Sequence, residues 1–216
     1  MKTSSPSDII KKYKTHTMCT RQSITQNIKA VDYIIENNIK GAIVECGVWR
    51  GGSIAAILHR LSEYDDTSRQ AYLFDTFEGM TKPTSVDIRG KGVNKKIATE
   101  RYEKGKWCYG PMESVVNVMN MVPYPQENIN YVVGDVCETL PYNTGSISIL
   151  RLDTDFYEST KCELEHLFPL VSPGGVVIFD DYSCWAGCRK AVDDYLPNAK
   201  IEQPSMCGAI MYKEKY

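Results

Sequence analysis

Residues 42–53 read Ala-Ile-Val-Glu-Cys-Gly-Val-Trp-Arg-Gly-Gly-Ser, and this stretch decides the fold. A short apolar run ends in an acid and a glycine, as a buried strand commonly does. Three glycines then permit a tight turn, and the serine begins an apolar helical pattern. A strand that runs through a glycine turn into a helix predicts the first half of a βαβ unit.

The same alternation continues along the chain. Strand-like apolar runs occupy residues 42–48, 71–77, 129–136, 147–152 and 175–179, with a weaker pair at 200–202 and 209–213. Helical patterns occupy residues 21–38, 53–61, 113–121, 158–167 and 188–196. Strands that alternate with helices predict an α/β fold: a doubly wound, mostly parallel, seven-stranded, Rossmann-like sheet. We expect residues 1–40 to form an N-terminal helical extension that acts as a lid, and residues 41–216 to form the main domain.

Composition excludes several classes of protein. The 216 residues carry a net charge of only -2, which argues against holding nucleic acid by bulk electrostatics. No apolar run is long enough to span a membrane, and the polar start MKTSSPSD lacks a signal-peptide core, so we expect a soluble, cytoplasmic protein. The eight cysteines show no Cys-x-x-Cys spacing, which favours reduced thiols over a zinc site.

The small net charge hides two basic segments. Residues 1–40 hold seven basic and three acidic side chains, and residues 81–110 hold eight basic and three acidic ones. The second segment has the composition of a basic lid. Its lysines, among them Lys91, Lys95 and Lys96, suggest an anionic acceptor such as a phosphorylated or nucleotide-linked sugar.

Acidic residues follow all five of the stronger strands, at the sheet edge where α/β folds bind ligands. Glu45 before Gly47 suits the amino group of a ligand, and Ser53 could cap the helix or bind a carboxylate. Asp75 suits a ribose diol, and Asp135 lies where an adenine edge would be. A tight turn and helix caps explain each residue alone. Together they predict a site for S-adenosylmethionine, an adenosine with an amino-acid tail.

A second group of acids predicts a metal site. Asp153, Asp180 and Asp181 follow neighbouring strands, and carboxylates brought that close repel one another unless a cation joins them. Mg²⁺ is the expected ion because it prefers oxygen ligands. Two structural alternatives remain open: Asp155 caps the following helix and stays outside the metal shell, and Asp181 pairs with Arg151 or Arg189.

These motifs resemble the macrocin O-methyltransferase family. The similarity runs from about residue 18 to residue 195 and is carried by ECGVWRGGS, LFDTFEGM, GDVCETLP, RLDTDFYEST, VSPGGVVIFDDY and GCRKAVDDY. The resemblance implies a class I, metal-dependent sugar O-methyltransferase of the macrocin, mycinamicin and novobiocin type, and a dimer or larger assembly. It also implies that residues 18–21 fold over the cofactor. Thr154 departs from the glycine usual in the family.

The expected reaction is methylation of a hydroxyl on a deoxysugar, such as a rhamnose unit of a glycan or glycosylated metabolite. Mg²⁺ would orient vicinal hydroxyls, and Asp180 or Asp181 would accept the proton. Trp107, Tyr109 and Trp185 are candidates for stacking on the sugar, and His16 could reach the site. The alternatives are a catechol-type O-methyltransferase and a non-catalytic S-adenosylmethionine-binding module.

Overall fold

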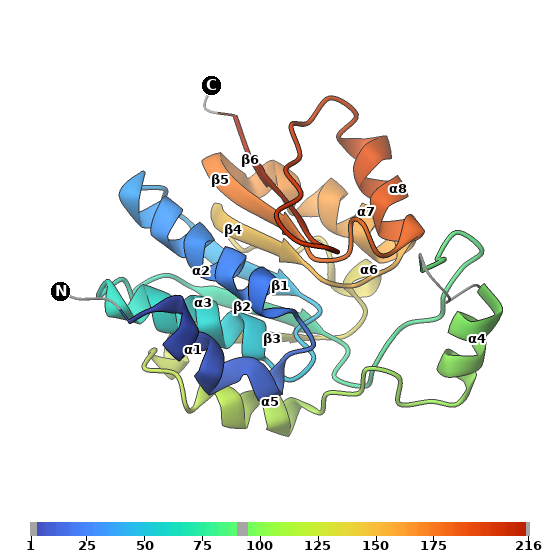
Figure 1. Ribbon diagram of the computed structural model, residues 1–216, viewed down its shortest axis with the longest axis horizontal. Helices are drawn as coiled ribbons and strands as arrows, with labels where there is room; N and C mark the ends of the chain where they lie inside the picture. Colours follow the sequence, from blue (N-terminus) through green and yellow to red (C-terminus); the bar gives the residue numbers. More distant parts are fainter. Residues whose placement is uncertain (1–3, 90–94, 215–216) are drawn as a thin grey trace.

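Five parallel strands and one antiparallel strand form a single sheet in the computed structural model, which describes residues 4–89 and 95–214 (Figure 1). The order is β3-β2-β1-β4-β5-β6, so the chain changes winding direction between β1 and β4. The strands are β1 Ala42–Cys46, β2 Ala71–Asp75, β3 Ile129–Val133, β4 Ile147–Leu152, β5 Val171–Phe179 and β6 Ala209–Tyr212. The predicted doubly wound α/β fold is confirmed.

The predicted seven strands are reduced to six among the described residues. The weak pattern at residues 200–202 forms only an isolated antiparallel bridge between Glu202 and Ile210. Gln22 Nε2 donates to the carbonyl of Pro204, which lies in the loop before β6. A side-chain hydrogen bond therefore attaches this loop to the N-terminal helices. The sequence had predicted a strand at residues 200–202 instead.

Both faces of the sheet are buried, as the apolar strands predict. Along β1, Ile43 points into one core and Val44 and Cys46 point into the other. The first core is covered by α1 Pro6–Tyr13, α2 Arg21–Glu36, α3 Gly52–Glu63 and α5 Met112–Met119, and the second by α6 Val136–Thr139, α7 Tyr157–His166 and α8 Ala186–Tyr195 (Figure 1). Helix α4, Lys95–Glu103, lies at the side of the sheet.

The N-terminal helices share the core of the sheet. Helix α1, which the sequence analysis missed because it is only eight residues long, buries Ile9, Ile10 and Tyr13. Arg60 on α3 ties the segment down: it donates to Asp32 of α2 at 2.6 Å and to the carbonyl of Ser4 at 3.0 Å. The division of the chain at residue 40 into an N-terminal extension and a main domain stays a prediction.

Parts of the basic segment 81–110 lie outside the described residues. Lys91 is among them, and the side chains of Lys95 and Lys96 are likewise not described. In the described ranges 4–89 and 95–214, no helix has the length and apolar character needed to cross a membrane.

Gly41 lets β1 start close beside β4. Its φ is +132°, and a Cβ there would lie 2.7 Å from the Ser146 carbonyl oxygen and 2.8 Å from Ser148 N. We expect Gly41→Ala to lower the free energy of unfolding by about 3 kcal/mol, because a strained dihedral and a backbone clash combine. Gly145→Ala is the control: its φ is +66° with nothing within 4 Å, so only about 1 kcal/mol should be lost. Urea unfolding measures both, and equal losses would contradict this explanation.

Candidate functional site

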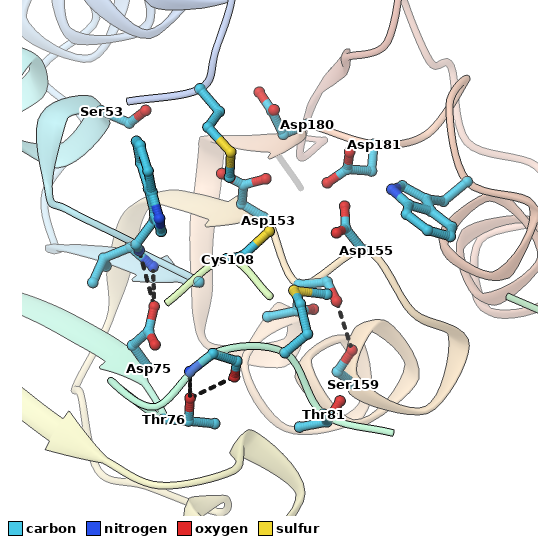
Figure 2. Close-up of a pocket in the computed structure, with 18 of the residues that line it drawn as sticks. Ser53, Asp75, Thr76, Thr81, Cys108, Asp153, Asp155, Ser159, Asp180 and Asp181 are labelled. Atoms are coloured by element: carbon cyan, nitrogen blue, oxygen red, sulfur yellow. Dashed lines mark hydrogen bonds between the residues drawn. The ribbon is translucent and has the colours of Figure 1, made fainter. Parts of the chain in front are cut away.

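A cavity of about 410 Å³ opens at the carboxyl ends of the strands, beside the point where the winding reverses (Figure 2). Of the predicted site residues, all but one line it: Gly47, Ser53, Asp75, Asp135, Asp153, Asp180 and Asp181. Glu45 is the exception, because it is 1% exposed and lies behind the cavity wall. The strand ends therefore converge as the sequence analysis expected.

The glycine loop after β1 is held by Asp75 at the end of β2. One oxygen of Asp75 accepts hydrogen bonds from Val48 N at 2.7 Å and Trp49 N at 2.9 Å, and the other accepts from Phe77 N at 2.8 Å. Burial raises the pKa of Asp75, and these backbone donors oppose that rise. Asp75 thus fixes the loop in place, and Oδ1, which accepts only the bond from Phe77 N, retains a lone pair for a ligand.

Gly47 and Asp153 meet with no space between them. Gly47 has a φ of +80°, and a Cβ on it would lie 2.1 Å from the Asp153 carbonyl oxygen. Next to it, Asp153 N donates to the Cys46 carbonyl at 2.9 Å. The glycine turn after β1 and Asp153 after β4 are therefore held in a fixed position relative to each other.

The segment between α1 and α2 forms a further wall of the cavity. Thr17, Met18, Cys19 and Thr20 line it, and Ser53 contacts Thr17 Oγ1 at 3.0 Å and Cys19 Sγ at 3.2 Å. Ser53 is not the N-cap of α3, a position held by Gly51 at a φ of 82°, so the capping alternative is wrong. Burial raises the pKa of Cys19 far above its usual value, which keeps it a neutral thiol.

Four carboxylates line the cavity next to this segment, those of Asp153, Asp155, Asp180 and Asp181 (Figure 2). Oxygens of Asp153, Asp155 and Asp181 all lie within 4.8 Å of one another. Asp180 instead groups with Asp153 and Cys19. The geometry therefore brings Asp155 into the group, where the sequence analysis had left it outside.

Burial dominates the electrostatics of these acids. It raises the pKa of Asp153 and of Asp181 well above the usual range, and the neighbouring carboxylates raise them further. Burial also raises the pKa of Asp155 to about 7. Asp181 Oδ2 is buried and has no hydrogen-bond partner among the described residues. This donor set, with hard oxygens crowded together and one buried oxygen unpaired, fits a divalent cation.

Arg151 on β4 is the functional residue that the sequence analysis did not place. Its guanidinium is fully buried and donates to Glu45 at 2.5 Å, Asp153 at 2.7 Å and Asp180 at 2.8 Å. The expected pairing of Asp181 with Arg151 or Arg189 is wrong, since Arg189 pairs with Asp193. Burial raises the pKa of Glu45 to about 7, although Arg151 opposes the rise.

The backbone is strained around the cavity. Trp49, Cys108 and Asp155 line it and have positive φ values of 49°, 52° and 66°. Non-glycine residues in this region cost about 1 kcal/mol or more each and concentrate at functional sites. The strain falls on Asp155 itself, one of the four clustered carboxylates.

Of the four remaining candidates, the three aromatic residues predicted to stack on the sugar and His16, only two line the cavity. Trp107 and Trp185 line the cavity, whereas Tyr109 and His16 are not among its lining residues. His16 lies against α3, where its carbonyl occupies the space that a Cβ on Gly52 would need, at 2.6 Å.

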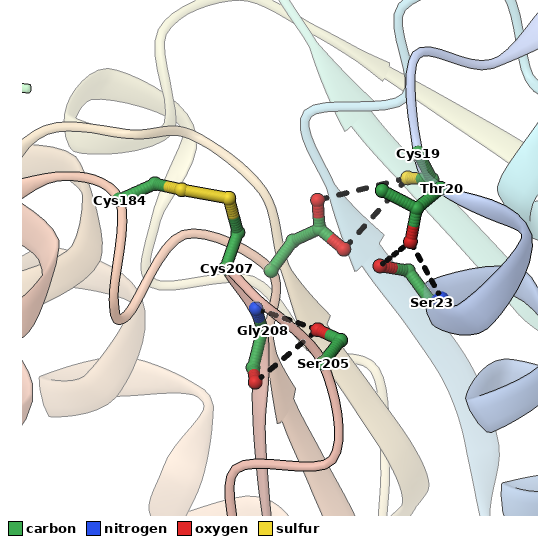
Figure 3. Close-up of a disulfide and its surroundings, with 8 residues drawn as sticks. Cys19, Thr20, Ser23, Cys184, Ser205, Cys207 and Gly208 are labelled. Carbon is green, nitrogen blue, oxygen red and sulfur yellow. Dashed lines mark hydrogen bonds between the residues drawn. A yellow bond between two sulfur atoms is a disulfide. The ribbon is translucent and has the colours of Figure 1, made fainter. Parts of the chain in front are cut away.

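One pair of cysteines forms a disulfide, so the expectation of reduced thiols throughout is wrong. Cys184 and Cys207 are bonded, with Cα atoms 4.9 Å apart, on the two loops that follow β5 and precede β6 (Figure 3). The antiparallel pairing of β5 with β6 brings these loops together, which a separation of 23 residues in sequence does not reveal. Cys207 also lines the cavity, so the disulfide fixes part of its wall.

Comparison with known proteins agrees with this geometry. The profile of the macrocin O-methyltransferase family (TylF) matches residues 8–208. The 8-demethyl-8-(2,3-dimethoxy-alpha-L-rhamnosyl)-tetracenomycin-C 4'-O-methyltransferase of Streptomyces olivaceus is 34% identical over 190 residues, 88% of this chain and 70% of that protein. Demethyldecarbamoylnovobiocin O-methyltransferase of Streptomyces niveus is 33% identical over 83% of this chain and 67% of its own. The structure of the O-methyltransferase NovP superposes with a TM-score of 0.80 at 30% identity, covering 93% of this chain and 83% of NovP.

Removing Arg151 should unbalance the buried carboxylates. We expect Arg151→Met to lower the free energy of unfolding by about 3–5 kcal/mol at pH 8, because Glu45, Asp153 and Asp180 lose their cation. Without it the folded-state pKa values of Glu45 and Asp153, which burial already raises, rise further, so protonation at pH 5.5 should restore part of the loss. Arg189→Met, on an exposed pair, is the control and should cost under about 1 kcal/mol. Urea unfolding at both pH values checks this, and a loss independent of pH would refute it.

Proposed function

The chain belongs to the macrocin O-methyltransferase family, and we propose that it methylates a hydroxyl of a deoxysugar, such as a rhamnose unit of a glycan or glycosylated metabolite. Family membership makes it an S-adenosylmethionine-dependent O-methyltransferase. The observation that carries the proposal is the group of four carboxylates in the same cavity as the glycine loop. The Streptomyces olivaceus relative, whose name specifies a rhamnosyl group, supports a sugar acceptor.

We propose that S-adenosylmethionine lies along the β1–β2 side of the cavity. Gly47 leaves room for close approach, Asp75 is placed for the ribose, and Asp135 for the adenine edge. Ser53, near the N-terminus of α3, would bind the carboxylate end. Glu45 is directed at Arg151 instead of the cavity, so its proposed role changes from binding the amino group to positioning Arg151.

We propose that Asp153, Asp180 and Asp181 hold Mg²⁺. Asp153 and Asp180 each give one oxygen to Arg151, which leaves the second oxygen of each for the ion. Asp181 offers its unpaired Oδ2. When bound, the ion would act as a Lewis acid that lowers the pKa of a coordinated sugar hydroxyl.

Asp155 replaces Asp180 and Asp181 as the best candidate for the proton acceptor. It has no ion pair among the described residues, and it is held close to Asp153 and Asp181. A base works best when its pKa is near the working pH, and burial raises the pKa of Asp155 to about 7. The strained backbone at this residue holds its carboxylate toward the cavity.

The activity test compares three acceptors with labelled methyl donor: a rhamnosyl glycoside, a catechol and buffer alone. We expect Mg²⁺-dependent methylation of the glycoside, with Asp153→Asn and Asp155→Asn each lowering kcat at least 100-fold. Glu165→Gln, at an exposed position on α7, is the control and should retain full activity. Preference for the catechol would support the catechol-type alternative, and full activity of Asp153→Asn in excess chelator would disprove the metal mechanism.

Metal binding should also stabilise the fold in a pH-dependent way. Two of the proposed ligands, Asp153 and Asp181, have folded-state pKa values well above the usual range, so their protonated forms stabilise the metal-free protein at low pH, and this contribution is lost as the pH rises through the raised values. We therefore expect saturating Mg²⁺ to raise Tm by about 5 °C at pH 8 and by much less at pH 5.5, where protons compete. Asp153→Asn should remove the shift and Asp155→Asn should keep it. Calorimetry that finds equal shifts at both pH values would count against the site.

A further inference from the structure

One part of the cavity wall is aromatic and cationic. Trp107 and Trp185 both line it, with ring centroids 6.0 Å apart, and Phe156 packs edge-on against both rings. Two arginines, Arg89 and Arg101, line the same cavity and lie over these tryptophans. The cavity therefore contains a carboxylate region and a guanidinium region.

Each guanidinium lies over a tryptophan ring, and the charge of Arg89 also acts on Asp155, whose pKa it lowers. Arg89 Cζ is 5.7 Å from the centroid of Trp185, and Arg101 Cζ is 5.9 Å from that of Trp107. Stacking uses the flat face of a guanidinium and leaves its N–H donors at the edge free. Within residues 4–89 and 95–214, neither arginine has a carboxylate within 4.0 Å, whereas Arg60, Arg69 and Arg151 each have at least one.

Buried contacts hold Arg89 in this position. Asp87, which is fully buried, accepts from Tyr157 N at 2.8 Å and from Thr84 Oγ1 at 2.7 Å. Ala186 N donates to the Ile88 carbonyl at 2.8 Å, and Arg89 forms an antiparallel bridge with Trp185. The arginine backbone is thus attached directly to the start of α8.

Arg101 is held by the docking of α4. Ala98, one turn before it, is completely buried in the core that contains Phe156 and Trp185. The Trp107 carbonyl, in the segment after α4, accepts from Met80 N at 3.0 Å. Helix α4 is thus attached through Ala98, and the segment that follows it is attached through Trp107.

We propose that Arg89 and Arg101 form a subsite for a phosphoryl group attached to the sugar acceptor. This proposal rests on the proposed function, since it names the class of acceptor. A phosphate monoester or diphosphate carries about two negative charges near pH 7 and offers oxygens to both guanidiniums, whereas a carboxylate carries one. The acceptor would be a sugar phosphate or a nucleoside-diphosphate sugar, with its hydroxyls toward the carboxylates.

The kinetic test uses three forms of one deoxysugar: the 1-phosphate, the nucleoside diphosphate and the neutral methyl glycoside. We expect the wild type to prefer a phosphorylated form, and Arg89→Gln and Arg101→Gln each to raise its KM about 10-fold. The kcat/KM for the methyl glycoside should stay within about twofold of the wild-type value. The better of the two charged forms identifies whether a monoester or a nucleotide is bound.

Arg189→Gln is the matched control, because this exposed arginine of α8 lies 5.3 Å from the centroid of the Tyr182 ring and is not among the cavity-lining residues. It should leave all three KM values unchanged. If Arg89→Gln and Arg101→Gln weaken the charged and neutral acceptors equally, the arginines only balance the carboxylates and the subsite is refuted. Equal use of charged and neutral acceptors by the wild type would refute it too.

A binding test separates this proposal from the proposed function. Inorganic pyrophosphate is titrated calorimetrically into metal-free protein, and we expect the double variant to bind at least 10-fold more weakly, with wild-type binding weakened by salt. If no acceptor is methylated but the double variant loses pyrophosphate binding, the proposed function fails and the subsite stands. If wild type and double variant bind pyrophosphate alike, the subsite fails whatever the activity. Matching Tm values for the two proteins would exclude misfolding.

Discussion

The buried Arg151 guanidinium is the interaction on which the site depends. A charge without exposure to water must be compensated, and here the partners come from the ends of three adjacent strands: Glu45, Asp153 and Asp180. The same guanidinium contacts Cys19 Sγ at 2.9 Å, which links the N-terminal segment to the sheet. One side chain thereby links the end of β1, two of the four clustered carboxylates and the Cys19 segment of the cavity wall.

The sequence predicts where the site lies better than it predicts the ion pairs and the disulfide that hold the site together. Parallel strands carry their carboxyl ends to one edge, so Asp75, Asp153 and Asp181 could be placed together from strand pattern alone. Arg151 could not be assigned, because its partners depend on the Glu45–Arg151 register between β1 and β4, which the one-dimensional pattern does not contain. The Cys184–Cys207 disulfide was missed for the same reason, since it depends on how β6 pairs with β5.

Helix prediction failed where local signals are weak. Helix α1 has only two turns, and its apolar residues become informative only when they pack on α3. The seventh strand was predicted from the short apolar pattern at residues 200–202. In the structure, this segment forms only an isolated bridge, between Glu202 and Ile210. Both errors lie in segments whose structure is decided by tertiary packing, whereas the long apolar strands of the centre were located within a few residues.

The contact between Gly47 and Asp153 has a consequence for how the family can diversify. Gly47 and Asp153, the residues directly after β1 and β4, meet there through main-chain atoms, so the spacing between the glycine loop and Asp153 does not depend on any replaceable side chain. In the proposed function, the residues that would touch the rest of an acceptor come instead from the connections after β2 and β5. Redesign of acceptor scope would then exchange those connections and leave the glycine loop and Asp153 as the sheet sets them.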